Sequence, residues 1–144
     1  MGGLPLCEPA AATILLIGAN DKDRTYYAER IRIGLLDCHV LEAKHGNSGL
    51  ELYKSHSVDC TVTELHLPDM SGFALLHKVV PQVRQLQVAF MILARIAWKS
   101  LANIAQTNGA QAFLAKRATA GDELVPVIQK AIATVGRSRK DRQQ

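Results

Sequence analysis

The stretch CTVTELHLPDMSGFALLHKVV, residues 60–80, predicts a strand, a loop and a helix in immediate succession. Cys60–Glu64 is expected to form the strand. Residues 67–72 carry the proline, glycine and small polar residues that are typical of a loop, and Ser71 is suited to cap the helix that follows. Pro81 is expected to end this helix, because proline disrupts helical hydrogen bonding. The apolar face of the helix is made by Leu75, Leu76, Val79 and Val80.

The same alternation continues on both sides of this stretch. A helical segment is expected at 22–36, and a short one directly follows a turn at 45–48. Two more are expected at Trp98–Thr107 and from the region of Leu124 to Val135. Alternating strands and helices joined by right-handed crossovers build a parallel sheet with helices on both faces. The predicted class is therefore α/β, with a doubly wound five-stranded parallel sheet. Its other strands are expected at Thr13–Ile17, Val40–Ala43, Val88–Leu93 and Ala112–Ala115.

Apolar spacing also predicts which helical residues face the core. In the first helix, which Asn20 or Asp21 can cap, these are Tyr27, Ala28, Ile31 and Leu35. In Trp98–Thr107 they are Leu101, Ile104 and Ala105, and Asn108-Gly109 predicts a left-handed turn after that helix. In the last helix they are Leu124, Ile128, Ala131 and Val135, and Pro126 is tolerable only near its first turn.

The length and composition indicate one domain with a buried core. The chain has 144 residues, of which 48% are hydrophobic and 21% are charged, so wholesale disorder is excluded. We expect residues 1–11 to be a flexible leader, residues 12–136 to form the domain, and residues 137–144 to be a basic tail or linker stub.

Charge, hydropathy and cysteine content bear on location and partners. The net charge of +4 is concentrated in the tail, so nucleic acid is not expected to be the partner of the domain itself. No apolar run approaches the ~20 residues that span a bilayer, and the start of the chain lacks the features of a secretory signal. The three cysteines are scattered, so we expect a cytoplasmic protein without a disulfide framework.

Functional side chains are expected where the strands end. In open α/β sheets, ligands bind outside the carboxyl ends of the strands. The residues that directly follow the predicted strands are 18–21, 64–66, 94–95 and 116–117.

Four segments resemble the receiver domain of response regulators in two-component signalling: ILLIGANDKDR (14–24), HVLEAKHG (39–46), DCTVTELHLPDMSG (59–72) and NGAQAFLAK (108–116). The resemblance covers about residues 12–136 and implies a flavodoxin-like sheet in the strand order 2-1-3-4-5. It also implies phosphoryl transfer to an aspartate at the end of the third strand. In that family, two acids after the first strand hold a divalent metal, a hydroxyl ends the fourth strand, and a lysine ends the fifth.

This chain departs from the family pattern at most of those positions. Glu64 stands at the acceptor position, Ala94 replaces the hydroxyl residue, and only Lys116 matches. Gly18 and Ala19, followed by Asn20, stand where the two acids are expected. The resemblance therefore predicts a degenerate phospho-acceptor pocket made of Gly18, Ala19, Asn20, Glu64, Ala94 and Lys116.

These departures predict a pocket without the family's chemistry. Glu64 is the only carboxylate that the family alignment brings into the pocket, and one carboxylate is a poor magnesium site. Asp21 and Asp23 would rebuild a metal site only if their loop slipped from the family register. We expect weak or absent magnesium binding, no cofactor, no catalytic residue, and an ion pair between Glu64 and Lys116. Whether Glu64 mimics an activated state or has merely drifted is left open.

The expected function is that of a non-enzymatic, phosphorylation-independent interaction module of two-component signalling. Its expected partner is a histidine kinase, an output domain or a second receiver, and a homodimer through the face of the fourth helix, fifth strand and fifth helix is possible. Candidate residues of this surface are Arg95, Trp98, Lys99 and Phe113, with core packing as the alternative for Trp98 and Phe113. Two functional alternatives are phosphorylation on a displaced carboxylate and nucleic-acid binding by the basic tail.

Overall fold

The computed structural model describes residues 12–35, 37–84, 88–95, 99–116 and 121–143, and side chains are not described for residues 80–84, 121–123 and 136–143. Its centre is a five-stranded sheet in the order β2-β1-β3-β4-β5, in which every neighbouring pair is parallel. The predicted fold class and strand order are therefore confirmed. The strands are β1 (Ala12–Ile17), β2 (Cys38–Ala43), β3 (Cys60–Glu64), β4 (Ala89–Ala94) and β5 (Ala112–Ala115).

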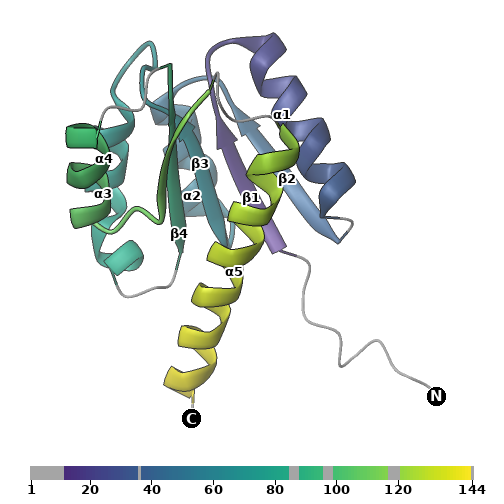
Figure 1. Ribbon diagram of the computed structural model, residues 1–144, viewed down its shortest axis with the longest axis vertical. Helices are drawn as coiled ribbons and strands as arrows, with labels where there is room; N and C mark the ends of the chain where they lie inside the picture. Colours follow the sequence, from purple (N-terminus) through teal and green to yellow (C-terminus); the bar gives the residue numbers. More distant parts are fainter. Residues whose placement is uncertain (1–11, 36, 85–87, 96–98, 117–120, 144) are drawn as a thin grey trace.

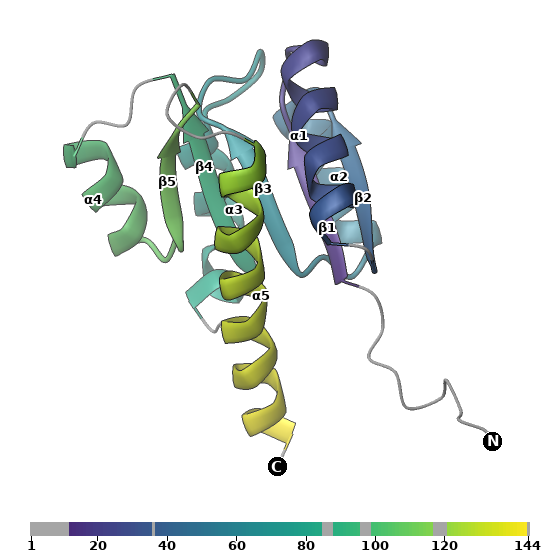
Figure 2. The ribbon, with the colours of Figure 1, turned by 45° about the vertical axis from the view of Figure 1, so that its right-hand side comes forward.

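Helices cover both faces of the sheet. One face carries α1 (Asp21–Gly34) and α5 (Gly121–Gln143), and the two views in Figures 1 and 2 show these helices side by side on that face. The opposite face carries α2 (Gly46–Ser55), α3 (Gly72–Arg84) and α4 (Lys99–Thr107). The sheet is thus the middle of three layers, as expected for a doubly wound fold.

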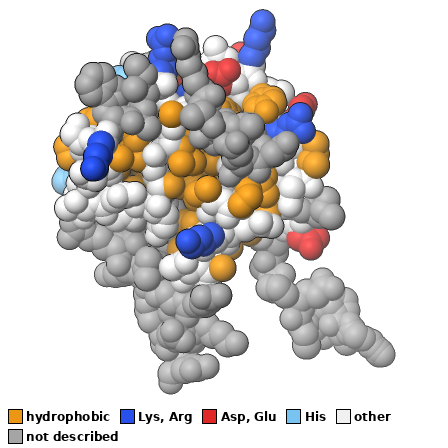
Figure 3. Space-filling model, viewed as in Figure 1, with side chains coloured by type: hydrophobic (Ala, Val, Ile, Leu, Met, Phe, Trp, Pro, Cys, Tyr) orange, Lys and Arg blue, Asp and Glu red, His pale blue; other side chains and the backbone are white. Residues whose placement is uncertain are grey.

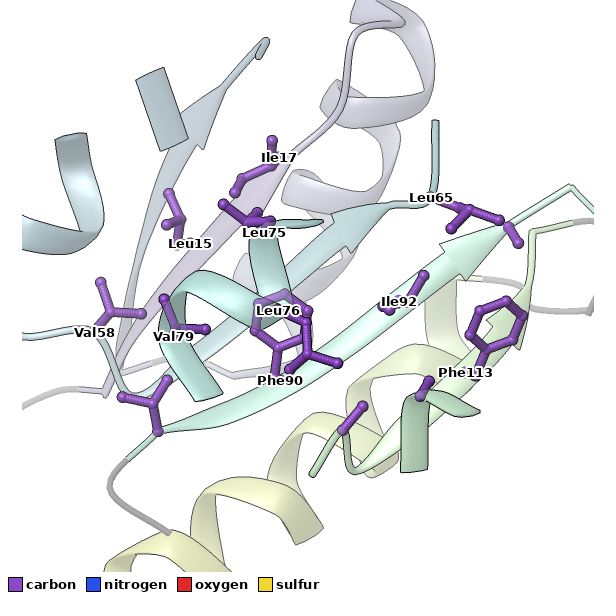
Figure 4. Close-up of a cluster of buried hydrophobic side chains, with 14 of the residues drawn as sticks. Leu15, Ile17, Val58, Leu65, Leu75, Leu76, Val79, Phe90, Ile92 and Phe113 are labelled. Carbon is purple, nitrogen blue, oxygen red and sulfur yellow. The ribbon is translucent and has the colours of Figure 1, made fainter. Parts of the chain in front are cut away.

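The strands alternate their side chains between two hydrophobic cores. Leu15, Ile17, Phe90 and Ile92 point toward α2, α3 and α4, where they meet the inner residues of α3 (Figure 4). The intervening strand residues join the core under α1 and α5, with Ile14, Leu16, Met91 and Leu93 among them. Full burial of one such side chain contributes about 1.5–3 kcal/mol, so these two cores account for the central strands being apolar on both faces.

Three predicted helix features are confirmed. Asn20 caps α1, because its Oδ1 accepts a hydrogen bond of 2.9 Å from the backbone N–H of Asp23. Gly109 adopts a φ of 104°, the left-handed turn expected after α4. Tyr27, Ala28 and Ile31 in α1 are buried, as are Leu124, Ile128, Ala131 and Val135 in α5.

Three other expectations were wrong. Pro81 does not end α3, which continues to Arg84. Proline has no backbone N–H, so the carbonyl of His77 loses its helical hydrogen bond. Because His77 is exposed, water can bond this carbonyl instead. Ile104 does not face inward and is 51% exposed, because the inner side of α4 is set by Leu101 and Ala105. The turn expected at 45–48 is the start of α2, with His45 as its N-cap residue.

The last helix runs through most of the predicted basic tail, since α5 extends to Gln143. The expected leader, residues 1–11, lies outside the described residues. No helix among the described residues combines the length and the apolar character that crossing a membrane requires.

Candidate functional site

The predicted pocket residues meet at the carboxyl edge of the sheet. The register pairs Ile17 with Thr63, Glu64 with Leu93, and Ala94 with Ala115, so the residues that end β1, β3, β4 and β5 lie at one level. Gly18 and Lys116 each follow directly after such a strand end. The parallel arrangement therefore brings Gly18, Glu64, Ala94 and Lys116 together, whereas Ala19 and Asn20 are exposed at the start of α1.

Glu64 and Lys116 form the ion pair that the sequence predicted. The Nζ atom of Lys116 lies 2.5 Å from Oε1 of Glu64, and the two side chains are only 18% and 14% exposed. The backbone N–H of Lys116 also donates a hydrogen bond of 2.7 Å to the carbonyl of Ala94. The end of β5 is therefore joined to both β3 and β4.

Gly18 makes room for the longer side chain of Glu64. A Cβ atom at position 18 would lie 3.0 Å from Cδ and 3.1 Å from Oε1 of Glu64, closer than ordinary van der Waals contact. The space that a side chain at position 18 would use is thus filled by the glutamate carboxylate. The two departures from the family pattern, glycine at position 18 and glutamate at position 64, fit each other sterically.

A second carboxylate, that of Asp23, also reaches Lys116. Oδ2 of Asp23 lies 2.5 Å from Nζ of Lys116. The expectation that Glu64 would be the only carboxylate in the pocket was therefore wrong. No slip of the loop is needed, because Asn20 caps α1 and the first helical turn carries the side chain of Asp23 back over the edge of the sheet.

The two carboxylates keep the lysine charged. Burial alone would lower the pKa of Lys116, but its hydrogen bonds with Asp23 and Glu64 outweigh burial, and the pKa is raised. Tyr27 adds a contact to the same residue, since its hydroxyl donates a hydrogen bond of 3.3 Å to the carbonyl of Lys116.

Asp21, the other acid of this turn, points away from the pocket. Its carboxylate lies 2.8 Å from Nη2 of Arg24 and 3.6 Å from Nζ of Lys44. The hydrogen bond with Arg24, followed by the charge of Lys44, lowers the pKa of Asp21. Asp21 therefore belongs to a different charge network from Asp23.

Arg24 is a buried residue of this edge that the sequence analysis did not single out. Its side chain is 9% exposed and donates a hydrogen bond of 2.6 Å to the carbonyl of Gly18. It also pairs with Glu42 on β2 at 3.1 Å. Arg24 therefore fixes the backbone at the end of β1. The sequence did not indicate this role, because an arginine in the first turn of a helix rich in polar residues is usually exposed.

Asp69 was also missed, and it fixes the loop that follows β3. Its carboxylate accepts hydrogen bonds of 2.8 Å from the backbone N–H groups of both Gly46 and Asn47, at the start of α2. The hydrogen bond from Asn47, together with the one from Gly46, outweighs the desolvation that would raise the pKa of Asp69, so this pKa is lowered. A carboxylate at a helix N-terminus is favourable, so this contact explains why α2 begins at Gly46.

The pocket residues do not fit a magnesium ion. Magnesium is held by carboxylates and waters, but both carboxylates of this pocket are bonded to Lys116, and Gly18 and Ala19 offer no side-chain oxygen. Across the part of the chain that the structure describes, no three His, Cys, Asp or Glu side chains form a group that could hold a metal ion. Ala94, which is buried, also lacks the hydroxyl that a phosphoryl group would require there.

The candidate partner surface is only partly accessible. Arg95 and Lys99 are exposed at the end of β4 and the start of α4, and Trp98 lies outside the described residues. Phe113 is 7% exposed and stacks on Phe73 of α3, with ring centroids 6.0 Å apart, so it takes the core role that the sequence left open.

Apolar side chains also reach the surface on the face that carries α1 and α5. The space-filling view shows hydrophobic side chains across the middle of the face that carries α1 and α5 (Figure 3). Half-buried apolar residues of β5 and α5 are Leu114, Val127 and Ile132. These residues pack against the core under α1 and α5 and are partly exposed on that side of the sheet.

Comparison with known proteins finds receiver domains both among family models and among solved structures. The family model of the response regulator receiver domain matches residues 14–129. The structure is similar to the receiver domain of the putative response regulator NarL from Mycobacterium tuberculosis, with a TM-score of 0.76 and 21% identity over 87% of this chain and 98% of that chain. It is also similar to a receiver domain protein from Clostridium thermocellum, with a TM-score of 0.75 and 24% identity over 92% and 99%.

A third similar structure is a DNA-binding response regulator of the LuxR family from Staphylococcus aureus, with a TM-score of 0.74 and 16% identity over 84% of this chain and 98% of that chain. At these identities the structural similarity concerns the fold. The search of curated proteins returned no significant match to this chain.

Proposed function

Because this chain belongs to the family of response regulator receiver domains, we propose that it is a degenerate member of that family, which acts in two-component signalling as an interaction module without being phosphorylated. The observation that carries the proposal is the engagement of Lys116 by two carboxylates, Glu64 and Asp23, each at 2.5 Å. In a phosphorylated receiver the lysine must offset the charge of the phosphoryl group, and here it is already neutralised.

The remaining pocket residues support the same proposal. Glu64 replaces the aspartate acceptor, its carboxylate fills the space beside Gly18, and Ala94 offers no hydroxyl. Phosphoryl transfer depends on positioning and on charge neutralisation, and this pocket supplies neither a metal site nor a free lysine. We accordingly propose that the domain catalyses no reaction and needs no magnesium.

The proposed activity is the binding of another protein, namely a kinase, an output domain or a second copy. The surface we propose for it combines the exposed residues Arg95, Lys99 and Ile104 with the half-buried apolar residues of β5 and α5. Trp98 belongs to the same proposal from sequence alone. The proposal includes a cytoplasmic location, a domain at residues 12–136 and a basic extension at 137–144.

A second candidate function rests on Asp23. Its carboxylate lies in the pocket and is 45% exposed, so a phosphodonor can approach it more readily than it can approach Glu64. If Asp23 were phosphorylated, the domain would still respond to phosphorylation, but its acceptor would lie on α1 instead of at the end of β3.

One experiment separates the two functions. The full chain is incubated with acetyl phosphate and magnesium, and its intact mass is measured, followed by peptide mapping after borohydride trapping. A variant that restores the three acids of the family pattern, Gly18→Asp with Ala19→Asp and Glu64→Asp, is the matched control. We expect a phosphoryl mass increment on the control and none on the natural chain. Any phosphoryl increment on the natural chain overturns the main proposal, and an increment that maps to Asp23 supports the second function.

A further inference from the structure

We infer that Asp23, Glu64 and Lys116 form an ionic clamp that holds the end of β5 against α1 and β3, so that this edge of the sheet keeps one arrangement. The inference rests on the proposed function in one respect, namely that no phosphoryl group enters to compete for the lysine. Within the clamp, Asp23 is a positioning residue for β5.

All the polar groups of Lys116 are engaged. Its Nζ atom bonds Glu64 on β3 and Asp23 on α1, its N–H bonds the carbonyl of Ala94 on β4, and its carbonyl accepts from the hydroxyl of Tyr27. Two of these four contacts come from α1. A residue that is held from three neighbouring elements can move only if several hydrogen bonds break together.

The two halves of the clamp differ in their exposure to solvent. Glu64 is 14% exposed and Lys116 is 18% exposed, so this half is largely shielded from water and salt. Asp23 is 45% exposed, so its half of the clamp lies at the surface. Asp23 is therefore the member that a partner bound to the first turn of α1 can reach.

The clamp connects α1 to the proposed partner surface. β5 is tied to α1 through Lys116 at its end and packs on α3 through the stacking of Phe113 on Phe73. The next residue along, Leu114, is half-buried on the α5 side. Loss of the ion pair between Asp23 and Lys116 should thus change the mobility of β5 without disturbing the rest of the sheet.

Amide hydrogen exchange on the full chain, followed by NMR, tests the clamp. The N–H of Lys116 is a direct reporter, because it is bonded to Ala94 at 2.7 Å. In Asp23→Asn we expect this amide to exchange about tenfold faster, the effect of losing one charged hydrogen bond, while the amide of Ile92 in the centre of β4 keeps its rate. Glu64→Gln should accelerate the Lys116 amide at least as much.

The matched control is Asp21→Asn. It removes the same charge from the same helical turn, but Asp21 pairs with Arg24 and Lys44 instead of Lys116. The inference is overturned if Asp23→Asn leaves the Lys116 amide unchanged, or if Asp21→Asn accelerates it equally, since the helix terminus alone would then explain the effect. These outcomes are independent of the phosphodonor assay, so the clamp and the proposed function can fail separately.

Discussion

Replacing Gly18 by alanine should weaken the ion pair between Glu64 and Lys116. The new Cβ would lie 3.0 Å from Cδ of Glu64, so the carboxylate must move by a few tenths of an ångström or more. The backbone at position 18 is not in the left-handed region, and an alanine in a compatible conformation normally stabilises a protein by about 0.4–1 kcal/mol. A loss of stability would therefore report the contact with Glu64 and not the backbone.

The magnitude follows from a double-mutant cycle. A hydrogen bond between charged groups contributes about 1.5–3 kcal/mol, and displacing the carboxylate should cost part of it, so we expect Gly18→Ala to lower the free energy of unfolding by about 1 kcal/mol. In the background Glu64→Asp, whose shorter side chain leaves the space open, the same alanine should be neutral or stabilising. The expected coupling energy is about 1–2 kcal/mol.

Urea unfolding of the natural chain, both single variants and the double variant gives the four free energies that the cycle needs. Additivity within about 0.3 kcal/mol would refute the steric match between positions 18 and 64.

Two further predictions concern residues outside the ion pair. Thr61 is 2% exposed, and its buried hydroxyl has no hydrogen-bond partner among the described residues. Thr61→Val should therefore stabilise the domain by about 1 kcal/mol in urea unfolding, and a loss of stability of that size would show that the hydroxyl is bonded after all. Asp69→Ala should cost about 1 kcal/mol, as the loss of a helix cap does. Because the pKa of Asp69 is lowered by folding, its contribution is present above its unfolded pKa of about 3.9 and lost as the pH falls further. The natural chain should therefore lose more stability than Asp69→Ala on acidification below about pH 4, and parallel curves would contradict the cap.

Much of the fold could be predicted because hydrophobic periodicity is a property of the sequence, whereas the strand order came from the resemblance to receiver domains. The strands β1 and β4 are apolar on both faces, and this pattern, in alternation with helical segments, indicates a buried parallel sheet. The inner face of α5 was predicted correctly, since four residues at helical spacing define one stripe. Helix α4 has only 9 residues, and so short an apolar pattern does not separate the inner Ala105 from the exposed Ile104.

The candidate site was predicted less completely, because it depends on side-chain direction. The resemblance to the family pattern located Gly18, Glu64, Ala94 and Lys116, and the parallel register brings these positions together. It could not show that Asp23, on the first turn of α1, bends back to Lys116.

The role of Asp69 was hidden for a related reason. Its partners are backbone N–H groups of residues 46 and 47, which lie 23 and 22 positions away in the chain. Every non-proline residue carries such a group, so no residue type in the sequence marks the contact.

Magnesium binding is the most direct test of the claim that this pocket has exchanged its metal site for an internal ion pair. The melting temperature of the natural chain is measured with and without millimolar magnesium chloride, next to the variant with Gly18→Asp, Ala19→Asp and Glu64→Asp. Ligands that bind the folded state raise the melting temperature. We predict no shift for the natural chain and a clear rise for the variant, whereas a magnesium-dependent rise in the natural chain would contradict the account.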